Sequence, residues 1–142
     1  MGVDRIVVER LLAEMEAAVA TLRRHENVTL AELEASPERA WALEHGLQIA
    51  IQALLGVGNH ILAAEGASGV EEYADILVGL AERGVLPREY AESIRGMAGF
   101  RNLLVHGYAR VDLARVREFL RTRLGDFNVF AGHVVRYLDS PR

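Results

Sequence analysis

Residues 36–66 read SPERAWALEHGLQIAIQALLGVGNHILAAEG, and this stretch decides the fold class. Ser36 before Pro37 is typical of a helix start, because serine caps free N–H groups and proline fits the first helical position. Gly66 is a suitable helix stop. The apolar positions between them form one broad helical face: Trp41, Leu47, Ile51, Leu54, Leu55, Ile61 and Leu62. The pattern predicts a long helix to about Glu65, buried at the centre of the domain.

Three glycines, at positions 46, 56 and 58, lie inside this predicted helix. Glycine lowers helix propensity, so its presence here needs a compensating reason. Because glycine has no side chain, we expect these positions to let another helix approach closely.

Helical patterns continue on both sides of this stretch. Before it, the 3.6-residue apolar period predicts a first long helix from Val3 to about Arg24. Thr29 to Glu32 has capping-box spacing and predicts a single turn or short helix. After it, Val70 to Arg83 reads as a helix that stops at Gly84.

The last third of the chain predicts two further helices. One runs from Arg88 to about Val105, after Pro87 restarts the chain. The other is capped by Asp112 and keeps an apolar stripe for seven turns, to Leu138. The sequence shows no alternation typical of strands. It therefore predicts one all-α domain over residues 1–142, an antiparallel bundle of four to five helices.

Composition excludes several classes of chemistry. The chain has no cysteine, so disulfides and thiolate sites are impossible. Its 16 cationic residues are all arginine, which excludes P-loop nucleotide hydrolysis and lysine Schiff bases. No targeting signal or membrane-spanning segment is evident, so we expect a soluble cytoplasmic protein that does not contact the membrane.

The net charge of −4 is unevenly distributed along the chain. Residues 1–94 carry a net −9, whereas residues 95–142 carry a net +5. Such asymmetry is typical of a protein with a polyanionic partner, although a merely solvated charged face would also produce it.

The positions of the histidines along the sequence do not match the spacing of a metal site. None of the five lies three or four positions from another, so the helical His pair of a zinc site is missing. We therefore expect no metal and no cofactor. Asn59 and His60 are expected as a hydrogen-bonded pair in the core, and His133 with Tyr137 in a structural or interface role.

Residues 101–108, RNLLVHGY, carry the strongest chemical signal. Asn102 and His106 are one helical turn apart and share a face, while Arg101 lies about 140° from His106 around the axis. Gly107 permits the helix to end, which would leave Tyr108 on an accessible turn. Arginine can hold a phosphate, and histidine can move the proton of a ribose hydroxyl. Together they could cleave RNA without a metal by using its 2′-hydroxyl as the nucleophile.

These eight residues match the Arg-x4-His-x-Tyr signature of the HepT-like toxins in the HEPN superfamily, which the chain resembles over nearly its whole length. The resemblance implies an all-helical two-fold dimer that acts as a metal-independent endoribonuclease. Arg101 and His106 match the catalytic pair, with Asn102 as the supporting polar residue. Tyr108 matches the tyrosine that a nucleotidyltransferase antitoxin modifies with AMP to silence the toxin.

A second function remains open at this stage. The chain could be a non-enzymatic helical dimer that serves as the binding subunit of a nucleotidyltransferase, with Arg101 and His106 as interface hydrogen-bonding groups. The complete motif favours the ribonuclease, and a nucleotidyltransferase reading frame beside the gene would support the pairing.

Arginines beyond the motif could extend an RNA-binding track. Arg117 and Arg121 are one turn apart beside the apolar stripe of the last helix, and Arg110 and Arg115 precede them. The alternative is a solvated helix face on which these arginines pair with Glu118 and Asp126.

Overall fold

The computed structural model describes residues 2–67, 69–106 and 111–140. In this part of the chain there are eight helices and no strand, so the predicted all-α class is confirmed. The helices are α1 (Arg5–Arg23), α2 (Leu30–Ala35), α3 (Pro37–Ala64), α4 (Tyr73–Glu82), α5 (Arg88–Ser93), α6 (Gly96–His106), α7 (Leu113–Thr122) and α8 (Gly125–Asp139). The expected number of four to five helices is wrong, because two predicted helices are each divided in two and the short helix is present.

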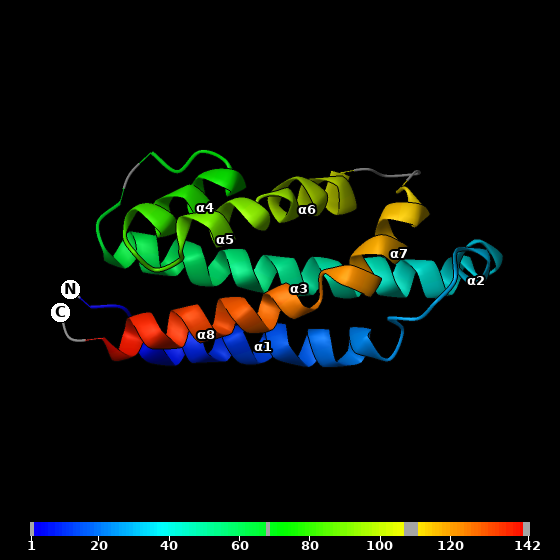
Figure 1. The fold of residues 1–142 in the computed structure, drawn as a ribbon, viewed down its shortest axis with the longest axis horizontal. Helices are drawn as coiled ribbons and strands as arrows, with labels where there is room; N and C mark the ends of the chain where they lie inside the picture. Colours follow the sequence, from blue (N-terminus) through cyan, green and yellow to red (C-terminus); the bar gives the residue numbers. More distant parts are fainter. Residues whose placement is uncertain (1, 68, 107–110, 141–142) are drawn as a thin grey trace.

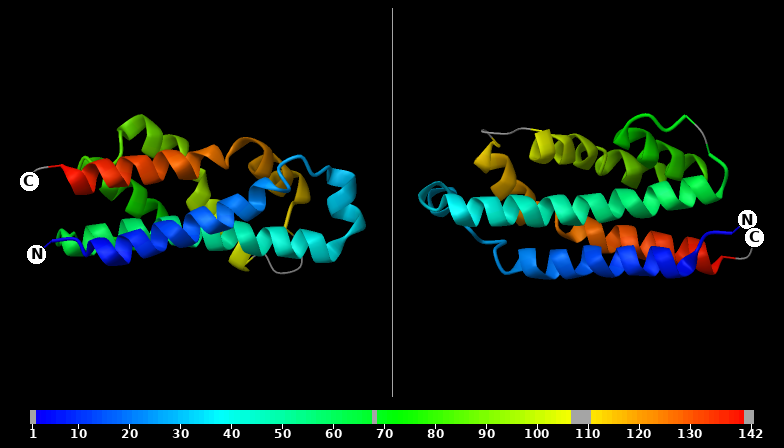
Figure 2. Two further views of the ribbon diagram at one scale, coloured as in Figure 1. Left: turned by 90° about the horizontal axis from the view of Figure 1, so that it is seen from below. Right: turned by 180° about the vertical axis from the view of Figure 1, so that it is seen from behind.

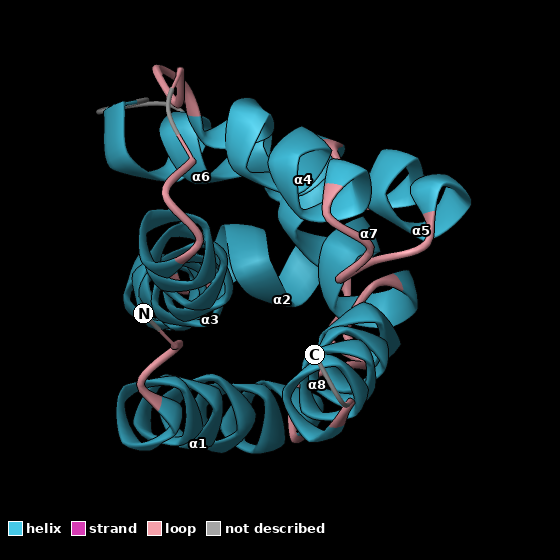
Figure 3. Cartoon of the chain, turned by 90° about the vertical axis from the view of Figure 1, so that its left-hand side faces the viewer, coloured by secondary structure: helices cyan, strands magenta, loops and turns pink. Residues whose placement is uncertain are grey.

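Helix α3 runs through the middle of the molecule (Figure 1). Helices α1 and α8 lie along one side of it, and α4, α5 and α6 lie along the other. Helices α2 and α7 gather at the end far from the chain termini, as two further views show (Figure 2). Seen along the bundle, α1, α3 and α6 form one row, and α8 lies beside α1 (Figure 3). The central, buried helix predicted from residues 36–66 is therefore α3, although Trp41, which was assigned to its apolar face, is 66% exposed.

Helix α3 begins and ends at the residues that the sequence predicts. The Ser36 side chain accepts from the N–H of Arg39, Pro37 is the first helical residue, and Gly66 follows the helix with a φ of +73°. Helix α3 is also long and apolar enough to cross a membrane, which the sequence analysis did not anticipate. However, 56% of that apolar window is buried inside the bundle, as expected for a core helix.

Glycines in α3 do permit close helix packing. A Cβ added at Gly58 would lie 2.5 Å from Cγ2 of Ile76 and 2.9 Å from Cδ1 of Leu80, so α4 can pack at this distance only against glycine. At Gly46 the nearest atom would be Cδ2 of Leu22, at 2.9 Å. Gly56 is different, because its nearest neighbour would lie at an ordinary 3.6 Å.

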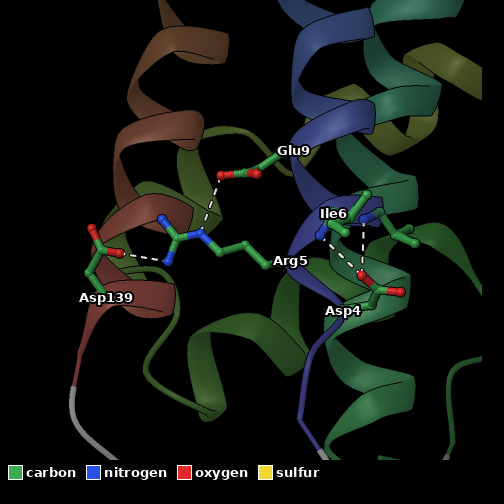
Figure 4. A network of polar contacts seen from close by, with 6 residues as sticks. Asp4, Arg5, Ile6, Glu9 and Asp139 are labelled. Atoms are coloured by element: carbon green, nitrogen blue, oxygen red, sulfur yellow. Dashed lines mark hydrogen bonds and ion pairs between the residues drawn. The ribbon is translucent and has the colours of Figure 1, made fainter.

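Contacts at one end of the bundle join α1 to α8, as Figure 4 shows, and also join α1 to α3. Asp4 caps α1 by accepting from the N–H groups of Ile6 and Val7, and its own N–H donates to Nε2 of His60. Arg5 pairs with Asp139 of α8 at 2.7 Å and with Glu9 at 3.2 Å. These contacts hold the first turn of α1 beside the last turn of α8.

The two unpredicted helix breaks face each other. The predicted helix 88–105 is divided between Ser93 and Gly96, and the predicted helix from Leu113 to Leu138 is divided between Thr122 and Gly125. At each break the series of helical backbone hydrogen bonds is interrupted, which leaves carbonyl groups without a partner within the helix. Arg123 from the second break donates to the carbonyl of Ser93 at the first, which joins the two.

A second bond joins the same two breaks. The hydroxyl of Tyr90 in α5 donates to the carbonyl of Asp126 in α8, at 2.5 Å. Burial, together with the charge of Asp126, raises the pKa of Tyr90, so the phenol remains a donor at all ordinary pH values. The breaks are thus stabilised by each other as well as by the local backbone hydrogen bonds at each of them.

Candidate functional site

Helix α6 positions the motif residues. Its inner face is buried through Met97, Ala98 and Phe100, and it packs against α3 and α4. The outer face carries Asn102 and His106, both exposed, as their spacing predicts. Because the apolar face fixes the rotation of α6, the polar residues of the motif lie at the surface.

Arg101 is half-buried and held by two contacts. Its Cζ lies 4.4 Å from the centroid of the Tyr73 ring, a cation–π contact with the first residue of α4. Its Nη1 donates to Oδ1 of Asn102 at 3.3 Å. Its Nε is buried and has no hydrogen-bond partner within the described residues. The guanidinium is therefore held in one orientation, with its Nη end the more accessible to an anion.

Tyr73 is the residue that the sequence analysis missed. It lies on a different helix, far from the motif along the chain, and nothing in its neighbourhood distinguishes it from a packing tyrosine. Only the packing of α4 on α6 brings its ring to Arg101. Asn102, in contrast, was expected to support the arginine, and it does contact it.

His106 is the last residue of α6. Within the described part of the chain, no hydrogen bond joins it to Arg101, whose Nη1 donates to Asn102 instead. One chain therefore presents the two groups near each other on α6 but not paired. A bound substrate or a second copy of the chain must complete any site that uses both.

Two predicted site residues, Tyr108 and Arg110, lie outside the described residues. Their proposed roles in AMP attachment and RNA binding stay predictions. The same holds for the helix end expected at Gly107, which also lies outside the described residues.

The arginines on α7 do not share one side of the helix. Arg115 lies over Phe100, its Cζ 5.4 Å from the ring centroid, beside a groove of about 350 Å³ between α6 and α7. Arg117 and Arg121 are one turn apart but lie about 160° and 120° from Arg115 around the axis. Asp126 pairs with Arg123 at 2.9 Å, so it is not the partner expected for the arginine track.

The remaining predicted polar pairs have structural roles. The expectation of a core Asn59–His60 pair is wrong for Asn59, which is exposed. His60 is half-buried and accepts the hydrogen bond from Asp4 at 3.2 Å. Tyr137 donates to the carboxylate of Glu65, which links α8 to the end of α3.

His133 lies between two neighbours. Its ring centroid is 5.0 Å from that of Tyr90, and its Nδ1 is 3.1 Å from Nη2 of Arg136. Burial, and then the charge of Arg136, lower the pKa of His133. Among the residues described, no group of three or more His, Asp or Glu side chains could hold a metal ion.

Comparisons with known proteins agree on one family. The sequence model of a family described as ribonuclease HepT-like matches residues 15–134. The tRNA nuclease HepT of Aphanizomenon flos-aquae is 24% identical over 137 residues, which make up 96% of this chain and 93% of that protein.

Solved structures share the fold. A tri-AMPylated HEPN toxin of Shewanella oneidensis, in complex with an MNT antitoxin, superposes with a TM-score of 0.81 at 18% identity, over 92% of this chain and 97% of that one. YutE of Bacillus subtilis, a cytosolic protein of unknown function, superposes with a TM-score of 0.79 at 20% identity, over 96% and 92% of the two chains.

Proposed function

Because the chain belongs to the HepT-like ribonuclease family, we propose that it is a metal-independent endoribonuclease and the toxin of a toxin–antitoxin pair. The observation that carries the proposal is the state of the motif: Arg101 is held by Tyr73 and Asn102, while His106 is exposed to solvent. The similarity to a tRNA nuclease supports RNA as the substrate.

The proposed chemistry uses only groups of this chain and of the RNA. His106 takes the proton of a ribose 2′-hydroxyl, and the 2′-oxygen attacks the adjacent phosphorus. The bond from phosphorus to the 5′-oxygen breaks, and that oxygen receives a proton from water or from a second His106. The products are a 2′,3′-cyclic phosphate and a 5′-hydroxyl. Arg101 stabilises the charge that develops on the non-bridging oxygens.

An isologous homodimer would complete the site. Since Arg101 and His106 are not paired within one chain, two copies of α6 facing each other across a dyad would combine four such groups in one cleft. The expected mass by light scattering is that of two chains at micromolar concentration. A mass of one chain would contradict this assembly.

We propose that the antitoxin is a nucleotidyltransferase that adds AMP to Tyr108. The AMPylated HEPN toxin of Shewanella oneidensis supports this regulation, and the cytosolic Bacillus subtilis relative supports a cytoplasmic location. An AMP phosphate beside Arg101 would compete with RNA for the guanidinium, and its bulk would block the site. Intact mass after incubation with the antitoxin, ATP and magnesium should rise by one or more AMP units, and Tyr108→Phe should prevent the increase.

The decisive experiment is RNA cleavage in the presence of EDTA. The parent should cleave RNA and leave a 2′,3′-cyclic phosphate. Arg101→Ala and His106→Ala should each lower the rate by about 10² to 10⁴ while the dimer stays folded. Arg83→Ala is the matched control, because Arg83 is an exposed arginine at the end of α4. A parent that binds the nucleotidyltransferase but cleaves no RNA would instead establish the non-enzymatic binding subunit.

A further inference from the structure

A pocket of about 410 Å³ lies between α3 and α4, and one of its lining residues is Tyr73, which contacts Arg101. Its α3 wall includes Gln52, Gly56 and Asn59, and its other wall includes Glu72 and Tyr73. We call it the α3–α4 pocket. Tyr73 therefore belongs both to this pocket and to the cation–π contact that holds Arg101. A ligand in the pocket would contact Tyr73, which in turn contacts the proposed catalytic arginine.

The charges of the pocket exclude a phosphate as its occupant. Glu71 and Glu72 contribute carboxylates, and no arginine is among its described lining residues. A phosphate here would be repelled, whereas at Arg101 it would be attracted. The arrangement suits a nucleotide whose uncharged base enters the α3–α4 pocket while its phosphate remains at the guanidinium.

The α3 wall presents two uncommitted amides. Gln52 and Asn59 are both exposed and lie two turns apart on one side of α3. Neither side chain makes a hydrogen bond to the rest of the described chain, so their donors and acceptors are available to a ligand. Gly56 lies between them without a side chain, and an added Cβ would touch only Leu11.

We propose that the α3–α4 pocket is the base subsite of the ribonuclease, and that it takes an unpaired RNA base bearing an exocyclic amino group. This inference rests on the proposed function for its link to cleavage. Single-stranded RNA is recognised by aromatic side chains and by hydrogen bonds to base edges. The pocket offers the ring of Tyr73 for the first and the amides of Gln52 and Asn59 for the second. Carboxylate and amide oxygens accept from the amino groups of adenine, cytosine and guanine, whereas uracil has none. Because Glu71 and Glu72 can only accept, they favour a base with an amino group over uracil, whereas the two amides orient whichever base is bound.

Binding of uncleavable RNA tests the base subsite separately from catalysis. The probes are fluorescein-labelled 2′-O-methyl hexamers of uridine in which one central base is A, C, G or U. One good base contact corresponds to at least about fivefold in affinity, so the parent should prefer A, C or G to U by that factor. Gln52→Leu with Asn59→Leu should reduce the preference to below twofold, while Asn128→Leu on α8 should leave it unchanged.

Further variants separate recognition from folding. Asn59→Asp and Gln52→Glu keep the shape of each side chain and remove its N–H donors, so they should alter the order of preference with the fold intact. Tyr73→Leu should weaken all four probes, and Tyr73→Phe should restore binding. No preference in the parent, or an unchanged preference in the double leucine variant, would overturn the subsite. Cleavage without base preference would overturn the subsite alone, and preference without cleavage would overturn only the catalytic proposal.

Discussion

At the scale of single residues, Arg101 depends on the shape of its guanidinium as well as on its charge. The planar group lies over Tyr73 and donates to Asn102 at the same time, which a lysine ammonium cannot reproduce. We therefore expect Arg101→Lys to lower the rate of RNA cleavage by about 10²-fold or more, although the charge is kept. Arg83→Lys, at an exposed position, should have no effect.

Tyr73 provides the control for this interpretation. Tyr73→Phe keeps the ring and the cation–π contact, so single-turnover cleavage should stay within about threefold of the parent. If Arg101→Lys cleaved as fast as the parent, the guanidinium would act as a point charge only. The contacts with Tyr73 and Asn102 would then have no part in positioning it.

His133 should make stability depend on pH. Because its pKa is lowered in the folded protein, the unfolded chain binds a proton first as the pH falls below about 6.5. The associated stability is present above that value and is lost as the pH falls through the folded pKa. Urea denaturation should show that the free energy of unfolding decreases between pH 7 and pH 5. Because the ring is partly solvated, we expect a decrease below about 1 kcal/mol. His133→Gln should abolish this decrease.

The neighbouring charge gives a second variant for this prediction. Arg136→Gln removes the charge 3.1 Å from Nδ1 of His133, so it should leave a smaller loss than in the parent. An identical pH dependence in the parent and in His133→Gln would show that other groups determine it.

At the scale of the helices, the two facing breaks depend on Arg123. It donates to the free carbonyl of Ser93 and pairs with Asp126, so Arg123→Ala leaves both groups without this partner. We expect a loss of about 1 kcal/mol in the free energy of unfolding, measured by chemical denaturation. Arg121→Ala, an exposed position two residues earlier, should change stability by less than about 0.5 kcal/mol. Equal effects would show that the joined breaks add no stability.

The approach of α4 to α3 depends on Gly58. An alanine Cβ there would lie 2.5 Å from Ile76, so α4 must move, and we expect Gly58→Ala to cost about 1 to 3 kcal/mol. Gly132→Ala in α8 is the matched control, because its Cβ would meet only Arg136 at 3.8 Å. It should stabilise the protein by about 0.5 to 1 kcal/mol through helix propensity. The thermal unfolding midpoints of the two variants show whether steric crowding or helix propensity determines the effect of each alanine.

Signals that are local in sequence predicted the helix ends correctly. Ser36 with Pro37, the capping box at Thr29 and Glu32, and the glycines at 66 and 84 all act within one turn of the chain. The breaks at 93–96 and 122–125 were missed, because the apolar stripe continues through both and their stabilising partners come from the opposite break. Tyr73 was missed for the same reason, since its contact with Arg101 depends on tertiary packing.

At the scale of the whole molecule, the uneven charge should determine how RNA binding depends on salt. The positive part of the chain, residues 95–142, includes Arg117 and Arg121 on one side of α7. If both contact single-stranded RNA phosphates, replacing them with alanine should make the slope of log affinity against log salt shallower by about 1.4. Base preference should not change, because phosphate contacts carry no sequence information. An unchanged slope would assign these arginines to a solvated face.

The ion pair between Arg5 and Asp139 spans 134 positions, and α1 packs along both α3 and α8. Helix α1 precedes α8 along the chain, so α1 cannot pack against α8 until α8 has been synthesised and has emerged from the exit tunnel. Long-range contacts of this kind form late, because their loop-closure entropy must be overcome before they add stability. Helix α6, in contrast, packs on α3 and α4, which precede it along the chain, so the orientation of Arg101 beside Tyr73 does not depend on this late closure.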